Sequence, residues 1–172
     1  MKRCEIRERP TLIRFNKNVD KRGFFASPFS NSEIKKLNAQ ELYISISFTN
    51  LMGTVRGMHF QTHPFCEAKL LTVLQGSIHD IVINTDQTIS KEERIFQFEL
   101  SDKDNSCLYI PKGYAHGYQA QTDNVLIMYA LDSKYSKLNT QGFSPLSENL
   151  LGLWPKMPIN IKKEDLAWPK YT

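Results

Sequence analysis

Residues 53–76 read GTVRGMHFQTHPFCEAKLLTVLQG, two apolar runs on either side of His63-Pro64-Phe65. Proline has no backbone N–H to donate, so Pro64 cannot lie inside a central strand. The stretch is therefore expected to form two antiparallel strands that fold back around Pro64. In a hairpin symmetric about this residue, His59 lies directly opposite Lys69, and opposed residues share one face of a sheet. That face would carry an imidazole base and an ammonium able to stabilise an oxyanion.

Similar short apolar segments, bounded by turns, continue along the chain in both directions. The expected strands are residues 11–15, 43–48, 54–60, 68–74, 78–83, 95–100, 107–110, 117–121 and 125–131, and residues 20–25 are expected to form a turn and an aromatic strand. Strands of this length and spacing predict an all-β sandwich or barrel. Ser30 and Glu33 have the spacing of a capping box, which predicts one short helix. The proline-rich tail, residues 144–172, has a weak helical signal and is expected to wrap around the barrel.

Length and composition are those of one soluble domain. The chain has 172 residues, of which 41% are hydrophobic and 23% charged, so residues 1–172 are expected to form a single domain. The net charge of +4 is spread along the chain, which argues against nucleic-acid binding and favours a small anionic substrate. No segment resembles a signal peptide or a membrane span. Cys4, Cys66 and Cys107 form no even framework, so reduced thiols and a cytoplasmic location are expected.

A second motif, Pro111-Lys-Gly-Tyr-Ala-His116-Gly, follows later in the strand set. Together with the segment from Gly53 to Gly76 it resembles the two-part signature of the cupin superfamily, an antiparallel β-barrel of the jelly-roll type. In that signature a second histidine stands where this chain has Gln61. A neutral amide is a poor metal ligand beside imidazole. A metal held by His59, Glu67 and His116 is therefore not expected, nor is any other cofactor.

One branch of that superfamily matches more closely. The strings DKRGFF, VRGMHFQ, EAKLLTVLQG and IPKGYAHGYQ, within residues 20–169, resemble the dTDP-4-dehydrorhamnose 3,5-epimerase family. The resemblance implies a homodimeric isomerase without metal that acts on a nucleotide-linked 4-keto-6-deoxy sugar in deoxysugar or surface-polysaccharide synthesis. It implies that His59 is the base and that Asp165 is the carboxylate holding it. It also implies that Lys69 stabilises the enolate oxygen and that Tyr129 is the acid on the opposite face of the sugar.

These residue types suit the chemistry of an epimerase. A proton next to a ketone is a weak acid, and a neutral imidazole with a pKa near 6.5 is a suitable base for removing it. A carboxylate on the other ring nitrogen fixes the tautomer and stabilises the imidazolium. An ammonium near the enolate oxygen lowers the barrier by a few kcal/mol, on the order of one oxyanion-hole donor. Inversion then needs a second proton source across the ring, such as a tyrosine hydroxyl.

The resemblance also implies a set of substrate contacts. Arg22 and Arg56 are expected to bind the diphosphate. Strict alternation along a strand puts Arg56 on the face opposite His59. Either Gly57 marks a bulge that re-aims the strand, or Arg56 contacts phosphate in another way. The remaining expected substrate contacts are Phe25, Gln61, His116, Tyr135 and Lys163.

The chain departs from the family at several positions expected to contact nucleotide or sugar. Ser27 stands in place of a glutamate, Ile44 and Ile46 replace a Gln-x-Asn pattern, and residues 144–146 replace an Arg-Trp-Asp-like run. These departures predict the same reaction on a different sugar nucleotide, or epimerisation at one carbon only. The sequence does not specify the base, the sugar or the carbon. Three alternatives remain: a cupin 3,4-ketoisomerase, a metal-dependent cupin such as a dioxygenase, and a sugar-nucleotide-binding protein without turnover.

Overall fold

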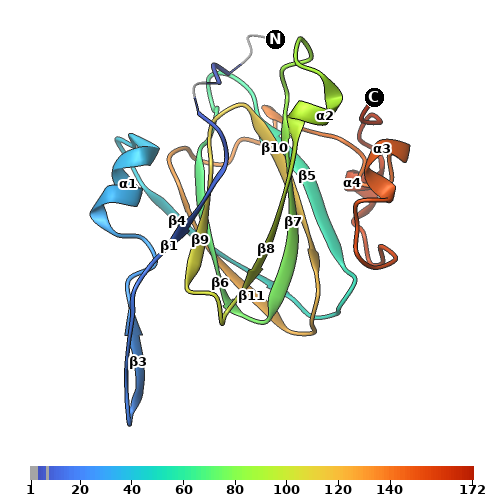
Figure 1. Cartoon of the computed structure of the whole chain (residues 1–172). Coiled ribbons are helices and arrows are strands. Elements are labelled where there is room, and N and C mark those ends of the chain that lie inside the picture. Colours follow the sequence, from blue (N-terminus) through green and yellow to red (C-terminus); the bar gives the residue numbers. More distant parts are fainter. Residues whose placement is uncertain (1–3, 7) are drawn as a thin grey trace.

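Two antiparallel five-stranded sheets packed face to face form the body of the structure, a computed structural model that describes residues 4–6 and 8–172 (Figure 1). The first sheet has the order β1 (Thr11–Arg14), β9 (Ser106–Ile110), β6 (Lys69–Gln75), β11 (Val125–Leu131) and β4 (Tyr43–Thr49). The second has the order β12 (Thr140–Gly142), β5 (Val55–Gln61), β10 (Tyr114–Ala120), β7 (Ser77–Asn84) and β8 (Ile95–Ser101). The all-β, antiparallel prediction is confirmed, although the two sheets do not close into one barrel.

Four short helices lie outside the sheets: α1 (Asn31–Leu37), α2 (Lys91–Arg94), α3 (Glu148–Leu151) and α4 (Lys163–Leu166). The capping box predicted for α1 is confirmed, because the Ser30 side chain accepts a bond from the first turn while Glu33 accepts one from the Ser30 N–H. The structure adds α2, α4 and β12, which the periodicity of the sequence did not predict. No helix in the described part of the chain is long and apolar enough to cross a membrane.

The main core lies between the two sheets and leaves one end of the space between them for polar side chains. Leu71 and Ile127 of the first sheet pack there against Val82 and Leu100 of the second. A second cluster lies on the outer face of the second sheet, where residues 144–172 pack against β5 and β7 (Figure 1). Tail side chains such as Trp154 contribute to that cluster. The tail is thereby fixed beside the strand that carries His59.

The hairpin expected around Pro64 does not form. β5 pairs with β10 and β12, whereas β6 pairs with β9 and β11. Residues 62–68 are therefore an arch that carries the chain from one sheet to the other. His59 lies opposite His116 within its sheet, and Lys69 lies opposite Leu131 within the other. The two side chains do share a site, because the sheets face each other, but not through cross-strand pairing.

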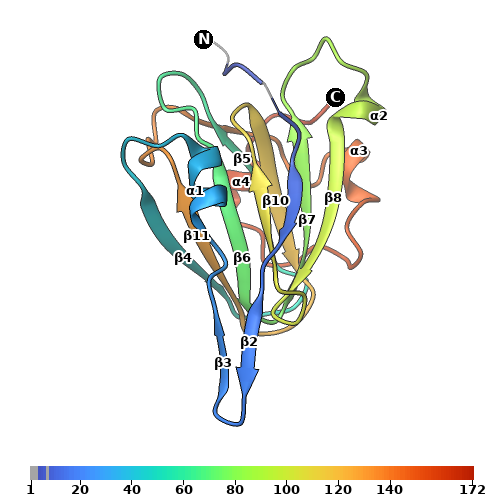
Figure 2. The same ribbon diagram turned by 60° about the vertical axis from the view of Figure 1, so that its left-hand side comes forward.

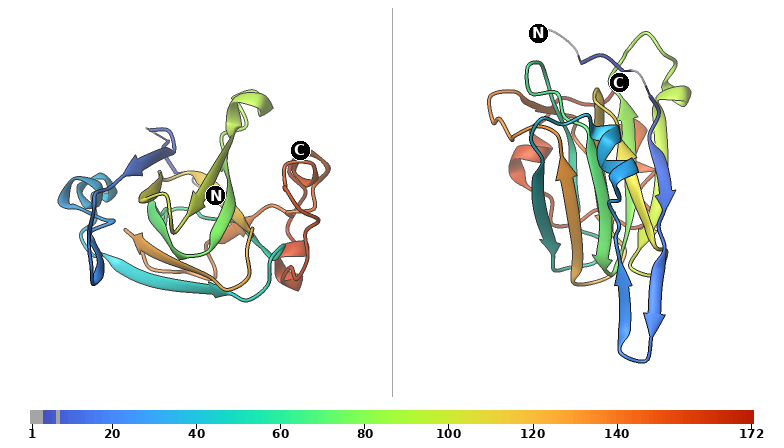
Figure 3. Two further views of the ribbon diagram at one scale, coloured as in Figure 1. Left: turned by 60° about the horizontal axis from the view of Figure 1, so that its bottom comes forward. Right: turned by 90° about the vertical axis from the view of Figure 1, so that its left-hand side faces the viewer.

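A hairpin of β2 (Lys17–Asp20) and β3 (Gly23–Ala26) extends beyond the two sheets (Figures 2 and 3). Its side chains include three exposed large hydrophobic residues, Val19, Phe24 and Phe25, which are 66–73% exposed. Arg22 lies at its tip and forms an ion pair with Asp20, with 2.7 Å between Nη2 and Oδ2. These three apolar side chains of the hairpin are thus not buried against any other described part of the same chain.

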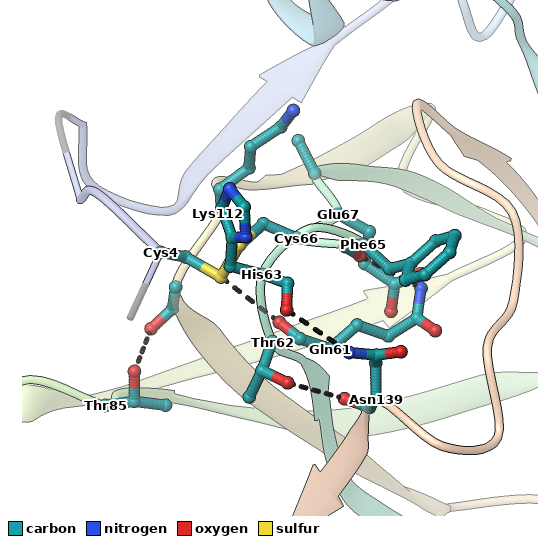
Figure 4. Close-up of a disulfide and its surroundings, with 12 residues drawn as sticks. Cys4, Gln61, Thr62, His63, Phe65, Cys66, Glu67, Thr85, Lys112 and Asn139 are labelled. Atoms are coloured by element: carbon teal, nitrogen blue, oxygen red, sulfur yellow. Dashed lines mark hydrogen bonds between the residues drawn. A yellow bond between two sulfur atoms is a disulfide. The ribbon is translucent and has the colours of Figure 1, made fainter. Parts of the chain in front are cut away.

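A disulfide joins Cys4 to Cys66 of the arch (Figure 4). The expectation that all three cysteines are reduced is therefore wrong for this pair. Sequence spacing did not reveal the pairing because the two residues are 62 positions apart and meet only after the N-terminal segment crosses the arch. Cys107 is a free, buried thiol, and burial raises its pKa to about 11.

Candidate active site

A cavity of about 690 Å³ opens between the sheets where the arch and the C-terminal tail meet. A second cavity of about 610 Å³ adjoins it. Five side chains line both cavities, and they come from both sheets and from the tail: His59, His116, Tyr129, Lys162 and Asp165. The two cavities are therefore parts of one cleft. Two joined cavities suit an elongated ligand better than a single small ring.

His59 and Asp165 form a hydrogen-bonded pair in the wall of the cleft. His59 Nε2 lies 2.7 Å from Asp165 Oδ1, and the backbone N–H of Gly57 donates to Asp165 Oδ2 at 3.4 Å. The carboxylate is buried, while the imidazole side chain is 38% exposed. A neutral imidazole that donates from Nε2 keeps its lone pair on Nδ1. The pair can therefore act as an oriented general base open to the cleft.

Lys69 enters the cleft from the other sheet and is paired with a carboxylate of the arch. Its Nζ lies 2.9 Å from Glu67 Oε1, and its side chain is 7% exposed. The imidazole and the ammonium thus line one cavity from facing sheets. This arrangement allows one group to remove a proton while the other faces the charge that develops.

Tyr129 and His116 line the same cavity as these two groups. Burial raises the pKa of the Tyr129 hydroxyl well above its ordinary value of 10, and Tyr118 and Asp80 add to the rise. Burial also lowers the pKa of His116, whose Nδ1 lies 3.2 Å from Asp80 Oδ2. The ring centroids of His116 and Tyr129 are 6.3 Å apart. At neutral pH the cleft therefore holds a protonated phenol next to an uncharged imidazole.

A bulge at Gly57 brings Arg56 into the cleft with His59. On β10 two steps separate His116 from Tyr118, but their partners on β5, His59 and Arg56, are three residues apart. Gly57 has φ +126°, and a Cβ there would lie 2.4 Å from the Cα of Gly117, so only glycine fits. The extra residue reverses the expected alternation. Of the two explanations the sequence allowed for Arg56, the bulge is the one observed.

Arg56, near the N-terminal end of β5, lines the second cavity. Its Nε donates to Thr49 Oγ1 at 3.0 Å and its Nη2 donates to the Phe48 carbonyl at 2.7 Å. Lys162 lines both cavities and adds a second cation to this part of the cleft. Two cations along one cavity wall are suited to an anionic group such as a diphosphate.

Gln61 lines the first cavity but uses its amide within the protein. Its Oε1 accepts from the Ser136 N–H at 2.6 Å, and its Nε2 donates to Glu67 at 2.9 Å and to the carbonyls of Phe65 and Lys134 at 3.2 and 3.1 Å. Both N–H donors of the amide are therefore occupied within the protein, as is one of the two acceptor positions of Oε1. Gln61 therefore has a structural role in the wall of the cavity, and its contact with substrate stays a prediction.

The structure leaves three expected substrate contacts outside the cleft of their own chain. Arg22 and Phe25 lie on the projecting hairpin, and Lys163 is exposed beside the cleft while its neighbour Lys162 enters it. Tyr135 does line the first cavity, although its side chain is largely exposed. Lys162 precedes α4 and Lys163 is its first residue. Sequence spacing did not show which of these two adjacent lysines faces the cleft.

The β4 positions expected to line the ligand site also point the other way. Ile44 and Ile46 are 57% and 66% exposed on the outer face of the first sheet, whereas Ser45 and Ser47 line the cavities. The first cavity is also lined by residues that the sequence did not single out, namely Phe60, Leu131, Lys137, Thr140, Glu164, Ala167 and Trp168. The second cavity adds Thr54, Val55, Tyr118, Asn160 and Ile161. Strand alternation from Tyr43 would have identified the two serines.

The carboxylate of the cupin metal set is already in use within the protein. Glu67 Oε1 pairs with Lys69 and Glu67 Oε2 accepts from Gln61. Across residues 4–6 and 8–172, no three His, Cys, Asp or Glu side chains gather in a group that could hold a metal ion. The donor set present here therefore does not fit a cupin metal.

Comparison with known proteins places this cleft in a family. The sequence profile of dTDP-4-dehydrorhamnose 3,5-epimerase matches residues 6–172. A dTDP-4-dehydrorhamnose 3,5-epimerase of Sinorhizobium fredii is 30% identical over 156 residues, which cover 89% of this chain and 80% of the relative. One of Shigella flexneri is 25% identical over 169 residues, 96% of this chain and 93% of the relative.

Solved structures agree. The Bacillus anthracis dTDP-4-dehydrorhamnose 3,5-epimerase, determined with TDP and pyrophosphate bound, has a TM-score of 0.84 at 26% identity over 94% of both chains. The Sulfolobus tokodaii enzyme has a TM-score of 0.81 at 28% identity, over 94% of this chain and 89% of that one. Sequence and fold lead to one assignment: the chain belongs to the dTDP-4-dehydrorhamnose 3,5-epimerase family.

Proposed function

We propose that this protein is an isomerase that epimerises a nucleotide-diphospho-4-keto-6-deoxy sugar at C3, C5 or both, through an enolate. The observation that carries the proposal is the His59–Asp165 pair, 2.7 Å apart, in a cleft that Lys69 and Tyr129 line from the facing sheet. Base, carboxylate, cation and phenol are the four groups this reaction needs. Membership of the family supports the same conclusion.

The chemistry follows from these groups. His59 takes the proton from the carbon next to the ketone, and the C–H bonding pair moves toward the carbonyl to form an enolate. Asp165 stabilises the imidazolium that results, and Lys69 stabilises the enolate oxygen. Tyr129 then returns a proton to the same carbon from the other face, which inverts the centre. A phenol whose pKa lies well above 10 is protonated before the reaction and can serve as that donor.

The nucleotide diphosphate is assigned to the part of the cleft lined by Arg56 and Lys162. The Bacillus anthracis relative holds TDP and pyrophosphate in its crystal structure, which supports a nucleotide diphosphate as the ligand class. The cleft does not carry the side chains of Ile44 or Ile46, where the family pattern has polar residues. These two positions therefore give no support to a different substrate. A sugar nucleotide other than the relatives' substrate, or inversion at one carbon, stays a prediction that rests on Ser27 and residues 144–146.

A homodimer would explain the projecting hairpin. Phe24 and Phe25 are 66% and 71% exposed, and Ile44, Ile46 and Phe48 add an exposed apolar row on the outer face of β4. Exposed apolar surface of this kind marks an interaction site. In a dimer the hairpin could carry Arg22 and Phe25 to the partner's cleft, where they would contact substrate as the sequence predicted. Light scattering of the purified protein tests the dimer, and Phe24→Ser should shift it toward monomer.

The cytoplasm remains the proposed location, because the family's ligand class, a sugar nucleotide, is an intracellular type of metabolite. The Cys4–Cys66 bond then has to form in a compartment that keeps most thiols reduced. Acid-quenched alkylation of the protein in freshly lysed cells tests this directly. If the reagent alkylates both Cys4 and Cys66, the two thiols are reduced in the cell.

Deuterium incorporation tests the reaction itself. The protein is incubated in deuterated water with several 4-keto-6-deoxy sugar nucleotides, and NMR follows label and configuration at C3 and C5. Label with inversion supports epimerisation and identifies the carbon, whereas a carbonyl moved to C3 identifies a ketoisomerase. No incorporation with any substrate would overturn the proposal. His59→Ala should abolish exchange, with exposed His63→Ala as the matched control, and Tyr129→Phe should retain exchange but lose inversion.

A further inference from the structure

The carboxylate of Glu67 is held at both oxygens. Oε1 pairs with Lys69 Nζ and Oε2 accepts from Gln61 Nε2, each at 2.9 Å. The side chain is 11% exposed. Glu67 thus lies between a buried cation of the cleft and the amide that ends β5. It is part of the arch, where Figure 4 shows it next to Gln61 and the disulfide.

Gln61 is itself fixed by backbone groups on two segments. It accepts from the Ser136 N–H at 2.6 Å and donates to the Phe65 carbonyl at 3.2 Å and the Lys134 carbonyl at 3.1 Å. Backbone partners move little compared with side chains, so the amide is a rigid support for the carboxylate. The same amide joins the arch to the segment that carries Tyr135. The position of Glu67 is therefore determined by the fold and not by its own rotamers.

A lysine gains most from such a support. Its ammonium is a point charge on a flexible four-carbon stem with three donors, so its direction is poorly defined without a partner. Electrostatic stabilisation of a transition state depends on groups that are already in place before charge develops. Glu67 takes one donor of Lys69 in a fixed direction and leaves the other two for the cleft. It also compensates the charge of a side chain that is 7% exposed.

We propose that Glu67, held by Gln61, is a positioning residue that orients the Lys69 ammonium toward the enolate oxygen. The inference rests on the proposed function, since it assumes that Lys69 stabilises an enolate. It gives Gln61 and Glu67, which both line the first cavity, a role that does not require either of them to touch the substrate. The carboxylate acts through Lys69, so its effect should disappear when the ammonium is absent.

The test is a double-mutant cycle on the rate of deuterium incorporation at saturating substrate. Glu67→Gln keeps the size of the side chain and removes its charge. It should lower kcat by about tenfold to a hundredfold, the range expected for weakening one charge-assisted hydrogen bond, with KM changed by less than about threefold. Lys69→Met should lower kcat by roughly a hundredfold to a thousandfold. The double variant should be no slower than Lys69→Met.

Two further variants separate positioning from general structural support. Glu67→Asp keeps the charge but shortens the side chain by one methylene, so its kcat should lie between those of the wild type and Glu67→Gln. It replaces Glu67→Gln in the test if that variant does not fold. Glu99→Gln removes a carboxylate that pairs with His79 on the outer face of β7 and β8, so it should leave kcat unchanged. Circular dichroism shows that each variant compared is folded.

The outcomes distinguish this inference from the proposed function. Exchange by the wild type together with an unchanged kcat in Glu67→Gln overturns the inference and leaves the epimerase in place. Losses that multiply in the double variant also overturn it, because Glu67 would then act on substrate directly. No exchange by the wild type with any 4-keto sugar nucleotide overturns the proposed function and this inference with it.

Discussion

The bond between Cys4 and Cys66 predicts a large dependence of stability on redox state. The two cysteines are separated by 62 residues along the chain. A cross-link that closes a loop of this length removes about 14 cal/mol/K from the unfolded ensemble in the chain-entropy relation, or about 4 kcal/mol at 25 °C. In a chain of 172 residues this corresponds to a change in melting temperature of about 8–16 °C. We expect the Cys4→Ser/Cys66→Ser double variant to lose stability by this amount.

Urea denaturation with and without dithiothreitol measures the difference. The reductant should lower the free energy of unfolding of the wild type to that of the double variant and leave the double variant unchanged. Thiol titration of the unfolded, unreduced protein should find a single free thiol, Cys107. Titration of all three cysteines, or equal stability of the oxidised wild type and the double variant, would refute the reasoning.

Three further predictions follow from the site. Gly57→Ala should destabilise the protein by about 2 kcal/mol or more in thermal unfolding, because its Cβ would lie 2.4 Å from the Gly117 Cα at a positive φ; unaltered stability would argue against the bulge. Asp165→Asn should leave folding intact and slow deuterium exchange by roughly 10³–10⁴-fold, since the amide favours the wrong tautomer of His59; a rate near that of the wild type would remove Asp165 from the mechanism. Burial lowers the pKa of His116 below its ordinary 6.5, so the unfolded chain takes up the proton first and the free energy of unfolding should fall as pH drops below about 6.5. Urea titrations at pH 7.5 and 5.5 should show that fall, and His116→Asn should reduce it.

Local signals in the sequence predicted the elements but not how they pair. The Ser30–Glu33 capping box and the strands expected at residues 43–48 and 125–131 depend on neighbours a few residues apart, and all three predictions are confirmed. The turn at Pro64 is equally compatible with a hairpin and with an arch between sheets. The choice between them depends on β10 and β11, which follow some fifty residues later and supply the partners of β5 and β6. Single-strand patterns carry no information about that choice.

The residues that line the site were easier to predict than the framework that carries them. His59, Lys69, Tyr129 and Asp165 are brought to one cleft as the family resemblance implied. Gln61 shows the limit of inferring residue roles from a family resemblance. Its position in the motif does not reveal whether its amide contacts a ligand or hydrogen-bonds to backbone groups.

The position of Asp165 has a consequence for how the enzyme fails when it is warmed. His59 belongs to a strand in the middle of a sheet, whereas its carboxylate sits on a four-residue helix of the tail. Short peripheral segments open at a lower free energy than the core does. The imidazole can therefore be left without its partner while both sheets remain intact. The working temperature of the catalyst would then be set by how firmly residues 144–172 are attached, and efforts to raise it should begin there and not in the core.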